Sequence, residues 1–168
     1  VLNDRIAHKG FAMSTNVRCA VIGAGWWGTT AHLPALLKHP RAEVICVHHR
    51  DNDIAQKIAA DFRIPHGVST LEDVLALEGL DAAVVSSAAV AHYAQAKACL
   101  ARGLHVLIEK PMTITEPEAR ELVELADKQG VQFLISGPFH YTEHAVEAKR
   151  IIESGTLGGI KMISVLYT

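Results

Sequence analysis

The feature that most constrains the fold is an apolar hexapeptide, Val17–Ile22, that runs directly into the sequence Gly-Ala-Gly-Trp-Trp-Gly at positions 23–28. The hexapeptide has apolar side chains at both odd and even positions, as expected of a parallel strand that is covered on both faces. Glycines at this spacing permit a tight turn and a close approach of the backbone. The segment therefore predicts a strand, a turn and the start of a helix, in that order.

Strands and helices are expected to alternate along the rest of the chain. Short runs rich in apolar residues predict strands at residues 43–47, 66–68, 81–86, 105–108 and 131–135. Amphipathic stretches predict one helix that ends near Lys38 and further helices at residues 54–62, 71–77, 92–102 and 116–128. Pro34 removes a backbone donor from the first helix, so we expect a kink or a late start there. The alternation predicts an α/β fold with a doubly wound parallel sheet.

The glycine pattern acquires a chemical meaning from its position. G-x-G-x-x-G indicates dinucleotide binding when it follows a strand and opens a helix. Gly23 then allows the turn, Gly25 lets the backbone approach a pyrophosphate, and Gly28 lets the helix pack on the strand. A glycine-rich turn without a ligand is the weaker interpretation in this context. Two interpretations of Trp26 and Trp27 stay open: they wall the nicotinamide pocket, or they pack near the edge of the domain.

A second cluster, Glu109-Lys110-Pro111, follows the expected strand at residues 105–108. Ligands of open α/β sheets bind outside the carboxyl ends of the strands, so we expect Lys110 to point into the ligand crevice. A surface lysine at a strand end is an equally good interpretation of the spacing alone. The isomer of the peptide bond before Pro111 stays open at this level.

These motifs, together with His92 and the run Glu-Ser-Gly-Thr-Leu-Gly at positions 153–158, resemble the Gfo/Idh/MocA family of dehydrogenases over residues 17–168. The resemblance implies a Rossmann domain followed by a substrate domain. It also implies hydride transfer between a nicotinamide and a hydroxyl or carbonyl of a sugar or polyol. In this interpretation Lys110 is the catalytic residue and hydrogen-bonds the reacting oxygen, while Glu109 shapes the nicotinamide end of the cofactor site.

The chain departs from the family pattern in three respects: after the fourth expected strand, after the sixth expected strand and in its length. Ser87-Ala88-Ala89 replaces the usual Thr-Pro-Asn and removes an amide, which leaves Ser87 as the candidate cofactor contact. His92 is a second candidate, and capping of the helix that begins there is an equally good interpretation. Tyr141-Thr142 stands where Arg-Phe is common.

The expected organisation is a disordered extension (residues 1–12), a dinucleotide-binding Rossmann domain (13–138) and the incomplete start of a substrate domain (139–168). Within that last part we expect a helix at residues 145–154 and a strand at 160–167.

The residues after the second strand suggest a choice of cofactor. NAD-specific Rossmann domains have an acidic residue about twenty positions past the glycines, whereas a nearby arginine accommodates the 2′-phosphate of NADP. By resemblance the acidic position falls on His49, and Arg50 follows it. We therefore expect NADP, with NAD as the alternative, and we expect Asp51 to cap the next helix. An exposed basic turn that makes no cofactor contact is the remaining alternative.

Two residue pairs imitate motifs of other enzyme classes. Tyr93 and Lys97 reproduce the Tyr-x-x-x-Lys of short-chain dehydrogenases, but they fall on a helix where neighbours four apart are common. His140 and His144 have the spacing of a helical metal pair, but no third ligand is evident. We expect no catalytic role for the first pair and no metal at the second.

Composition narrows the classes of function further. The formal net charge of −2 over 168 residues offers no general attraction to nucleic acid, and no apolar run approaches the roughly 20 residues of a membrane helix. Three cysteines, without metal-ligand spacing, are expected in the core rather than in disulfides. Without a signal-peptide pattern at its start, the chain is expected in the cytoplasm.

The leading hypothesis is the cofactor-binding half of an oxidoreductase, which by itself binds cofactor without turnover. Its expected partners are a sugar or polyol substrate and copies of itself, joined through the substrate domain. A non-catalytic dinucleotide-binding module and an NAD-dependent glycosidase are the alternatives. Lys110 favours hydride transfer over the module, because binding alone does not require it. The residues that would separate a dehydrogenase from a glycosidase are not among those in the sequence.

Overall fold

The computed structural model describes residues 16–164. The chain divides into two compact units, Val1–Ile135 and Ser136–Thr168. The extension expected at residues 1–12 lies outside the described residues.

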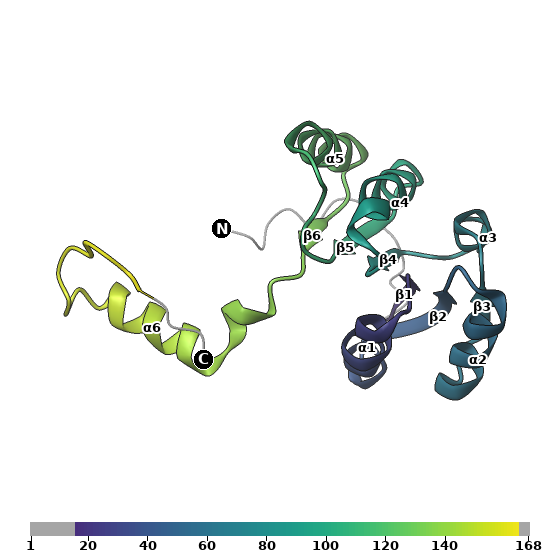
Figure 1. Cartoon of the computed structure of the whole chain (residues 1–168), viewed down its shortest axis with the longest axis horizontal. Helices are drawn as coiled ribbons and strands as arrows, with labels where there is room; N and C mark the ends of the chain where they lie inside the picture. The colour runs from purple at the N-terminus through teal and green to yellow at the C-terminus, as the bar shows by residue number, and fades with distance from the viewer. Residues whose placement is uncertain (1–15, 165–168) are drawn as a thin grey trace. The chain divides into compact units, whose positions relative to one another are not determined.

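The first unit is built on a six-stranded parallel sheet with the strand order β3-β2-β1-β4-β5-β6 (Figure 1). The strands are β1 (Val17–Ile22), β2 (Ala42–His48), β3 (His66–Val68), β4 (Ala82–Val85), β5 (His105–Ile108) and β6 (Phe133–Ile135). The order reverses between β1 and β4, and this reversal is the topological switch point of a doubly wound sheet. The fold class expected from the sequence is therefore confirmed.

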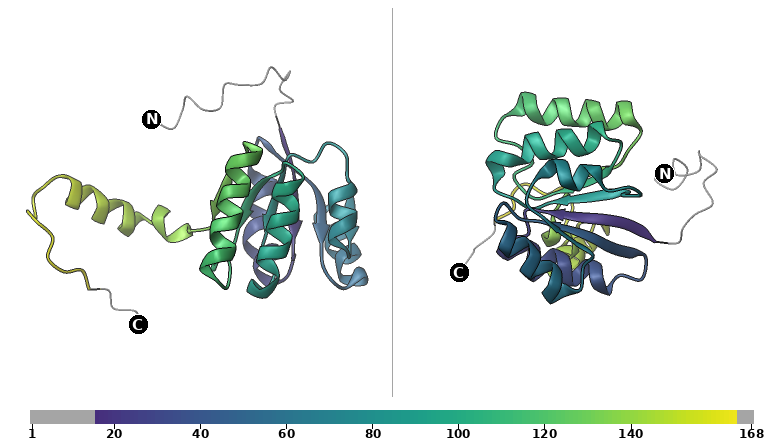
Figure 2. Two further views of the ribbon diagram at one scale, coloured as in Figure 1. Left: turned by 90° about the horizontal axis from the view of Figure 1, so that it is seen from above. Right: turned by 90° about the vertical axis from the view of Figure 1, so that its right-hand side faces the viewer.

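Five α-helices of this unit cover the two faces of the sheet (Figure 2). They are α1 (Leu33–Lys38), α2 (Asn52–Phe62), α3 (Leu71–Ala76), α4 (Ala89–Ala101) and α5 (Glu116–Gln129). Residues of α3, α4 and α5 share one buried cluster, and residues of α1 and α2 share another. The sheet thus separates two hydrophobic cores.

Strand β1 shows why the central strands carry apolar residues that point to both faces of the sheet. Ala20 and Ile22 belong to the core under α3, α4 and α5, whereas Cys19 and Val21 belong to the core under α1 and α2. Successive side chains of a strand point to opposite faces, so a strand between two helical layers needs apolar residues in both registers.

The helix that follows β1 is irregular. A five-residue π-helical segment, Gly28–His32, precedes α1, and Pro34 lies in the first turn of α1. The chain is already helical from Trp26, so Pro34 lies inside a continuous helical stretch and the expected late start is wrong. The π-helical segment just before Pro34 locally replaces the α-helical hydrogen-bond pattern that a proline would interrupt.

Helix α4 begins three residues before its expected start, with the extended residue Ala88 as its N-cap. His92 therefore lies inside the helix, and the interpretation of His92 as the residue that caps it is wrong.

The second unit contains a short 3-10 helix, Pro138–Tyr141, and the helix α6 (Glu143–Glu153). The strand expected at residues 160–167 is not formed over residues 160–164, and the rest of it lies outside the described residues. A strand forms only beside a partner that accepts its hydrogen bonds. Within residues 16–164, no helix has the length and apolar character needed to cross a bilayer.

Candidate functional site

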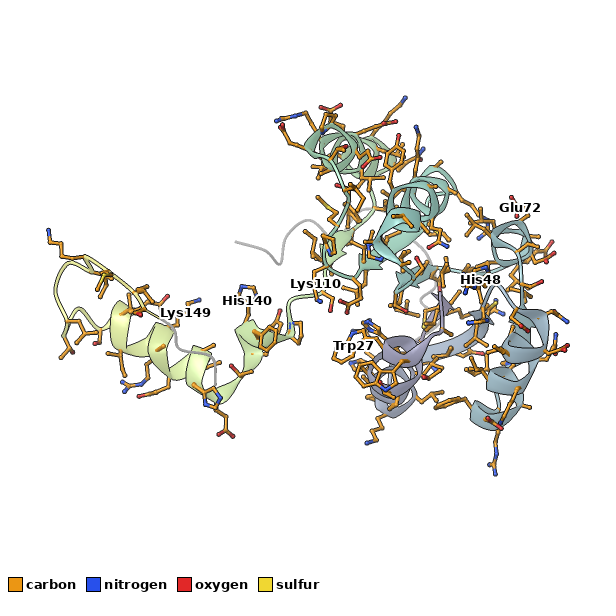
Figure 3. All side chains as sticks on the ribbon, in the orientation of Figure 1. Trp27, His48, Glu72, Lys110, His140 and Lys149 are labelled. Carbon is orange, nitrogen blue, oxygen red and sulfur yellow. The ribbon has the colours of Figure 1, made fainter. Side chains whose placement is uncertain are left out.

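Four loops meet the carboxyl edge of the sheet around the switch point. They are the glycine loop (residues 23–28) after β1, residues 49–51 after β2, residues 86–88 after β4 and residues 109–111 after β5. Figure 3 labels Trp27 and Lys110, which come from two of these loops, and His48, the last residue of β2. Parallel strands bring their carboxyl ends to one edge, so residues far apart in the sequence are gathered here.

Gly23 meets both a conformational and a steric requirement. Its φ of +77° lies in the left-handed region, which side chains with a Cβ rarely adopt. A Cβ at this position would lie 2.6 Å from the backbone nitrogen of Ser87. The N–H groups of Gly23 and Ala24 both donate to the carbonyl oxygen of His48, at 3.1 and 2.8 Å. The turn is thus fixed between the ends of β2 and β4.

Gly25, the second glycine of the loop, is not required by the packing of the fold. No atom of the described residues lies within 4 Å of a Cβ built on Gly25, and its φ is not left-handed. The protein itself therefore does not require glycine at this position. Open space above an exposed backbone at the start of a helix suits the approach of a diphosphate. Gly28, by contrast, packs tightly, because a Cβ there would lie 3.0 Å from Ser86 Oγ.

The carboxylate of Glu109 links the end of β5 to the helical segment after β1. Glu109 is only 7% exposed, and its Oε1 accepts a hydrogen bond from the indole Nε1–H of Trp27 at 2.8 Å. The ring Nε2 of His32 lies 2.9 Å from the same oxygen. A buried carboxylate needs such donors, because desolvation without them is costly. Trp27 therefore anchors Glu109, while Trp26 is 75% exposed.

Lys110 has a fixed backbone and an exposed side chain. Its N–H donates to Glu109 Oε2 at 3.2 Å, and the peptide bond to Pro111 is cis. The Lys110 side chain is exposed at the carboxyl end of β5. The structure therefore presents an ammonium group at the edge where ligands of such sheets bind.

His92 lies beneath the same loop. It is 1% exposed, with Nδ1 2.7 Å from the carbonyl oxygen of Pro111 and Nε2 3.0 Å from that of Ser87. The Ser87 hydroxyl donates to Gln95 Oε1 at 2.5 Å. Both ring nitrogens of His92 thus face protein carbonyls, and they tie the loop after β4 to the loop after β5.

The loop after β2 carries the residues expected at the adenosine ribose. Burial lowers the pKa of His48, and its Nδ1 accepts from the Gly23 N–H at 3.3 Å. His49 Nδ1 accepts from the Asp51 N–H at 3.1 Å, and the Arg50 side chain is exposed. The carboxylate of Asp51 accepts the N–H groups of Asp53 and Ile54 at the start of α2. The expectation that Asp51 caps this helix is confirmed.

Neither of the two residue pairs that imitate other motifs belongs to the four loops of the candidate site. Lys97 is 2.6 Å from Glu121 Oε1, and the Tyr93 hydroxyl donates to Glu121 Oε2 at 2.6 Å, which joins α4 to α5 at the surface. The hydrogen bond from Lys97 lowers the pKa of Glu121. His140 and His144 lie in the second unit, and among residues 16–164 no group of three or more His, Cys, Asp or Glu side chains could hold a metal ion.

His32 is the site residue that the sequence analysis missed. It belongs to no motif, and its partner Glu109 lies 77 positions away. A hollow among the described residues is no guide to this site, because it lies at the opposite edge of the sheet. This apolar hollow of about 440 Å³ is lined by residues at the amino ends of the strands, among them Val17, Ala42, Ala82 and His105.

The strand order, the switch point and the glycine loop define a dinucleotide-binding Rossmann domain. A family model described as an oxidoreductase family with an NAD-binding Rossmann fold matches residues 17–136. The chain belongs to this family, Gfo/Idh/MocA, and is an NAD(P)-binding oxidoreductase domain.

Individual relatives agree with this assignment. The chain is 35% identical over 152 residues to an uncharacterized oxidoreductase of Synechocystis, covering 90% of this chain and 41% of that protein. It is 31% identical to a dTDP-3,4-didehydro-2,6-dideoxy-α-D-glucose 3-reductase of Streptomyces antibioticus, covering 92% and 47%. A 3-ketoreductase of Actinomadura kijaniata solved with NADP has 28% identity and a TM-score of 0.79, covering 85% and 45%. The chain thus spans less than half the length of these relatives.

Proposed function

We propose that the protein carrying this chain is an NAD(P)-dependent dehydrogenase or reductase that acts on a hydroxyl or carbonyl group of a sugar or polyol. The observation that carries the proposal is the placement of Lys110. Its backbone N–H is bonded to Glu109, and its side chain is exposed at the carboxyl edge of the sheet. A domain that only bound a dinucleotide would not need this ammonium group. The sugar reductase of Streptomyces antibioticus among the relatives supports the substrate class.

The chain's own residues supply binding and orientation. The glycine loop and the helix start that follows it offer N–H groups and a partial positive charge to a diphosphate. Lys110 would hold the reacting oxygen of the substrate and stabilise the charge that develops on it. The nicotinamide, when bound, accepts or supplies the hydride. Trp26 and Ser87 remain candidate contacts on the cofactor side. His92, expected there from the sequence, is buried with both ring nitrogens on protein carbonyls, so it would act only through the loops that it joins.

NADP is the proposed cofactor in preference to NAD. His49 stands at the position that is acidic in NAD-specific domains, and Arg50 beside it is exposed. Oδ1 of the neighbouring carboxylate, Asp51, already accepts two backbone N–H groups at the start of α2. An arginine next to a 2′-phosphate forms charge-assisted, bidentate hydrogen bonds. With Nδ1 accepting from the Asp51 N–H, a neutral His49 ring carries its hydrogen on Nε2 and can donate it.

The proposal extends to organisation and compartment. Residues 13–138 form the cofactor domain, and residues 139–168 begin the substrate domain, through which copies of the protein would assemble. The described cysteines are free and buried, which suits a reducing cytoplasm. Burial raises the pKa of Cys19 to about 11, so its thiol is kept protonated and unreactive.

Calorimetric titrations of the chain with NADP and with NAD test whether it binds these cofactors as proposed. We expect both to bind, NADP more tightly, and we expect the chain by itself to show no turnover with sugars or inositols. The longer protein that carries this chain is then assayed on the same panel. Failure to bind either dinucleotide would overturn the proposal, and equal or tighter binding of NAD would overturn the NADP preference.

A further inference from the structure

Two histidines from different layers of the fold hold the tripeptide that contains Lys110. His32 comes from the segment before α1, and its side chain is 12% exposed beside the Glu109 carboxylate. His92 comes from α4 on the other side of the sheet and is fully buried beneath Pro111. We propose that His32 and His92, together the histidine clamp, are positioning residues that hold the backbone of Lys110 from two sides.

The first arm of the clamp acts through a carboxylate. His32 Nε2 and the Trp27 indole N–H both face Glu109 Oε1, at 2.9 and 2.8 Å. The other oxygen, Oε2, accepts the N–H of Lys110 itself at 3.2 Å. A carboxylate is an acceptor with two oxygens, so donors on one oxygen orient the other. The orientation of the Lys110 amide is therefore set by the segment that follows the glycine loop.

The second arm acts through a carbonyl. His92 Nδ1 lies 2.7 Å from the carbonyl oxygen of Pro111, and its Nε2 lies 3.0 Å from that of Ser87. Ser87 is pressed against the turn at Gly23, so the ring spans the distance between the glycine loop and the residue after Lys110. A neutral ring has one N–H to donate, whereas an imidazolium donates to both carbonyls. In either state the ring fills a site closed to water.

The consequence is that Lys110 keeps a fixed place relative to the glycine loop. Small displacements of a group that stabilises the reacting oxygen cost large factors in rate. The expected effect of the clamp on the reaction rate rests on the proposed function. Its effect on the position of the Lys110 backbone does not.

Hydrogen exchange of the Lys110 amide, measured in the chain without cofactor, tests whether the histidine clamp fixes the Lys110 backbone. His32→Phe removes the donor and keeps a ring, His32→Gln restores an N–H donor, and His92→Phe removes the second arm. His66→Gln, on an exposed histidine of β3, is the matched control. Should the phenyl ring prevent folding at position 32, His32→Leu replaces it.

We expect about tenfold faster exchange at Lys110 in both phenylalanine variants, the effect of losing one hydrogen bond to a charged or buried partner. Exchange at the Val21 amide, on a fully buried residue of β1, is compared in the same samples. A general loss of stability would accelerate both amides equally, whereas loss of positioning changes their ratio. We expect the ratio to stay within about twofold of the wild-type value in His32→Gln and in His66→Gln.

An unchanged ratio in both phenylalanine variants would overturn the clamp. Acylation of the Lys110 amine, followed by mass spectrometry with and without NADP, tests the proposed function separately. Protection of this amine by NADP in the wild-type chain is expected, together with loss of that protection in His32→Phe. If NADP binds but does not protect Lys110 in the wild type, the assigned role of Lys110 is wrong, and the exchange ratio still decides the clamp.

Discussion

The indole N–H of Trp27 donates to the buried carboxylate of Glu109 at 2.8 Å, a contact that spans 82 positions of the sequence. It joins the helical segment after β1 to the end of β5, on the two sides of β4 in the sheet. Trp26, the adjacent residue, is 75% exposed, whereas Trp27 is 40% exposed. Two neighbouring tryptophans thus have different roles, and this difference can be measured.

Trp27→Phe is expected to lower the free energy of unfolding by about 1.5–3 kcal/mol, because a buried carboxylate loses one of its donors. Trp26→Phe is the matched control, and its effect is expected within about 0.5 kcal/mol because the side chain is largely exposed. Denaturant titration followed by circular dichroism measures both. Equal effects of the two substitutions would contradict the anchoring role of Trp27.

The two glycines of the loop are expected to respond in opposite ways. Gly23→Ala forces a Cβ against the Ser87 backbone at a left-handed φ, so it should destabilise the fold by more than about 1 kcal/mol. Gly25→Ala meets open space and should leave the fold stable, while its methyl group hinders the diphosphate and weakens NADP binding. Thermal unfolding and calorimetric titration separate the outcomes. Unchanged NADP affinity in Gly25→Ala would argue against the diphosphate site.

Arg50→Ala is expected to weaken NADP binding by about ten- to a hundredfold, the loss of a charge-assisted contact to a 2′-phosphate. NAD, which lacks that phosphate, should bind the variant as it binds the wild type. Arg41→Ala removes an exposed arginine at the opposite edge of the sheet, just before β2, and serves as the control. Parallel weakening of NADP and NAD in Arg50→Ala would show that Arg50 does not contact the 2′-phosphate.

Lys110→Ala, made in the full protein that carries this chain, is expected to lower kcat by about a hundredfold or more and to change cofactor affinity little. A donor used mainly in the transition state has that signature. Lys128→Ala, an exposed lysine in the last turn of α5, is the control. Steady-state kinetics and cofactor titration make the comparison. A wild-type kcat in Lys110→Ala would show that Lys110 is a surface lysine without a catalytic role.

The free energy of unfolding is expected to fall as the pH drops below about 6.5, in part because of His48. Burial lowers the pKa of His48 in the folded chain, so the unfolded chain binds a proton first and is favoured by acid. Protonation would also remove Nδ1 as the acceptor of the Gly23 N–H. Denaturant titrations at several pH values between 5 and 8 give the free energy of unfolding at each pH. We expect this free energy to change less with pH in His48→Asn than in His66→Asn. An identical change with pH in the two variants would contradict this contribution.

The sequence by itself determined the architecture and pointed to the candidate site. Apolar residues in both registers of β1 indicate a covered parallel strand, and this pattern is legible because it depends only on neighbours along the chain. The glycine loop is local in the same sense, as is the helix cap at Asp51. The place of Lys110 at the carboxyl edge of the sheet follows from its position just after a strand.

Only the tertiary structure decided which side chains hold that lysine. The pairing of His32 with Glu109 and the placement of His92 beneath Pro111 join segments separated by 77 and 19 positions. Such contacts depend on strand order and register, which bring β1 beside β4 and β4 beside β5. Helix α4 likewise starts early, at Ala89, because its N-cap residue Ala88 has no capping side chain that would signal the start. Short-range patterns encode which elements form, whereas contacts between distant elements exist only once the sheet has brought those elements together.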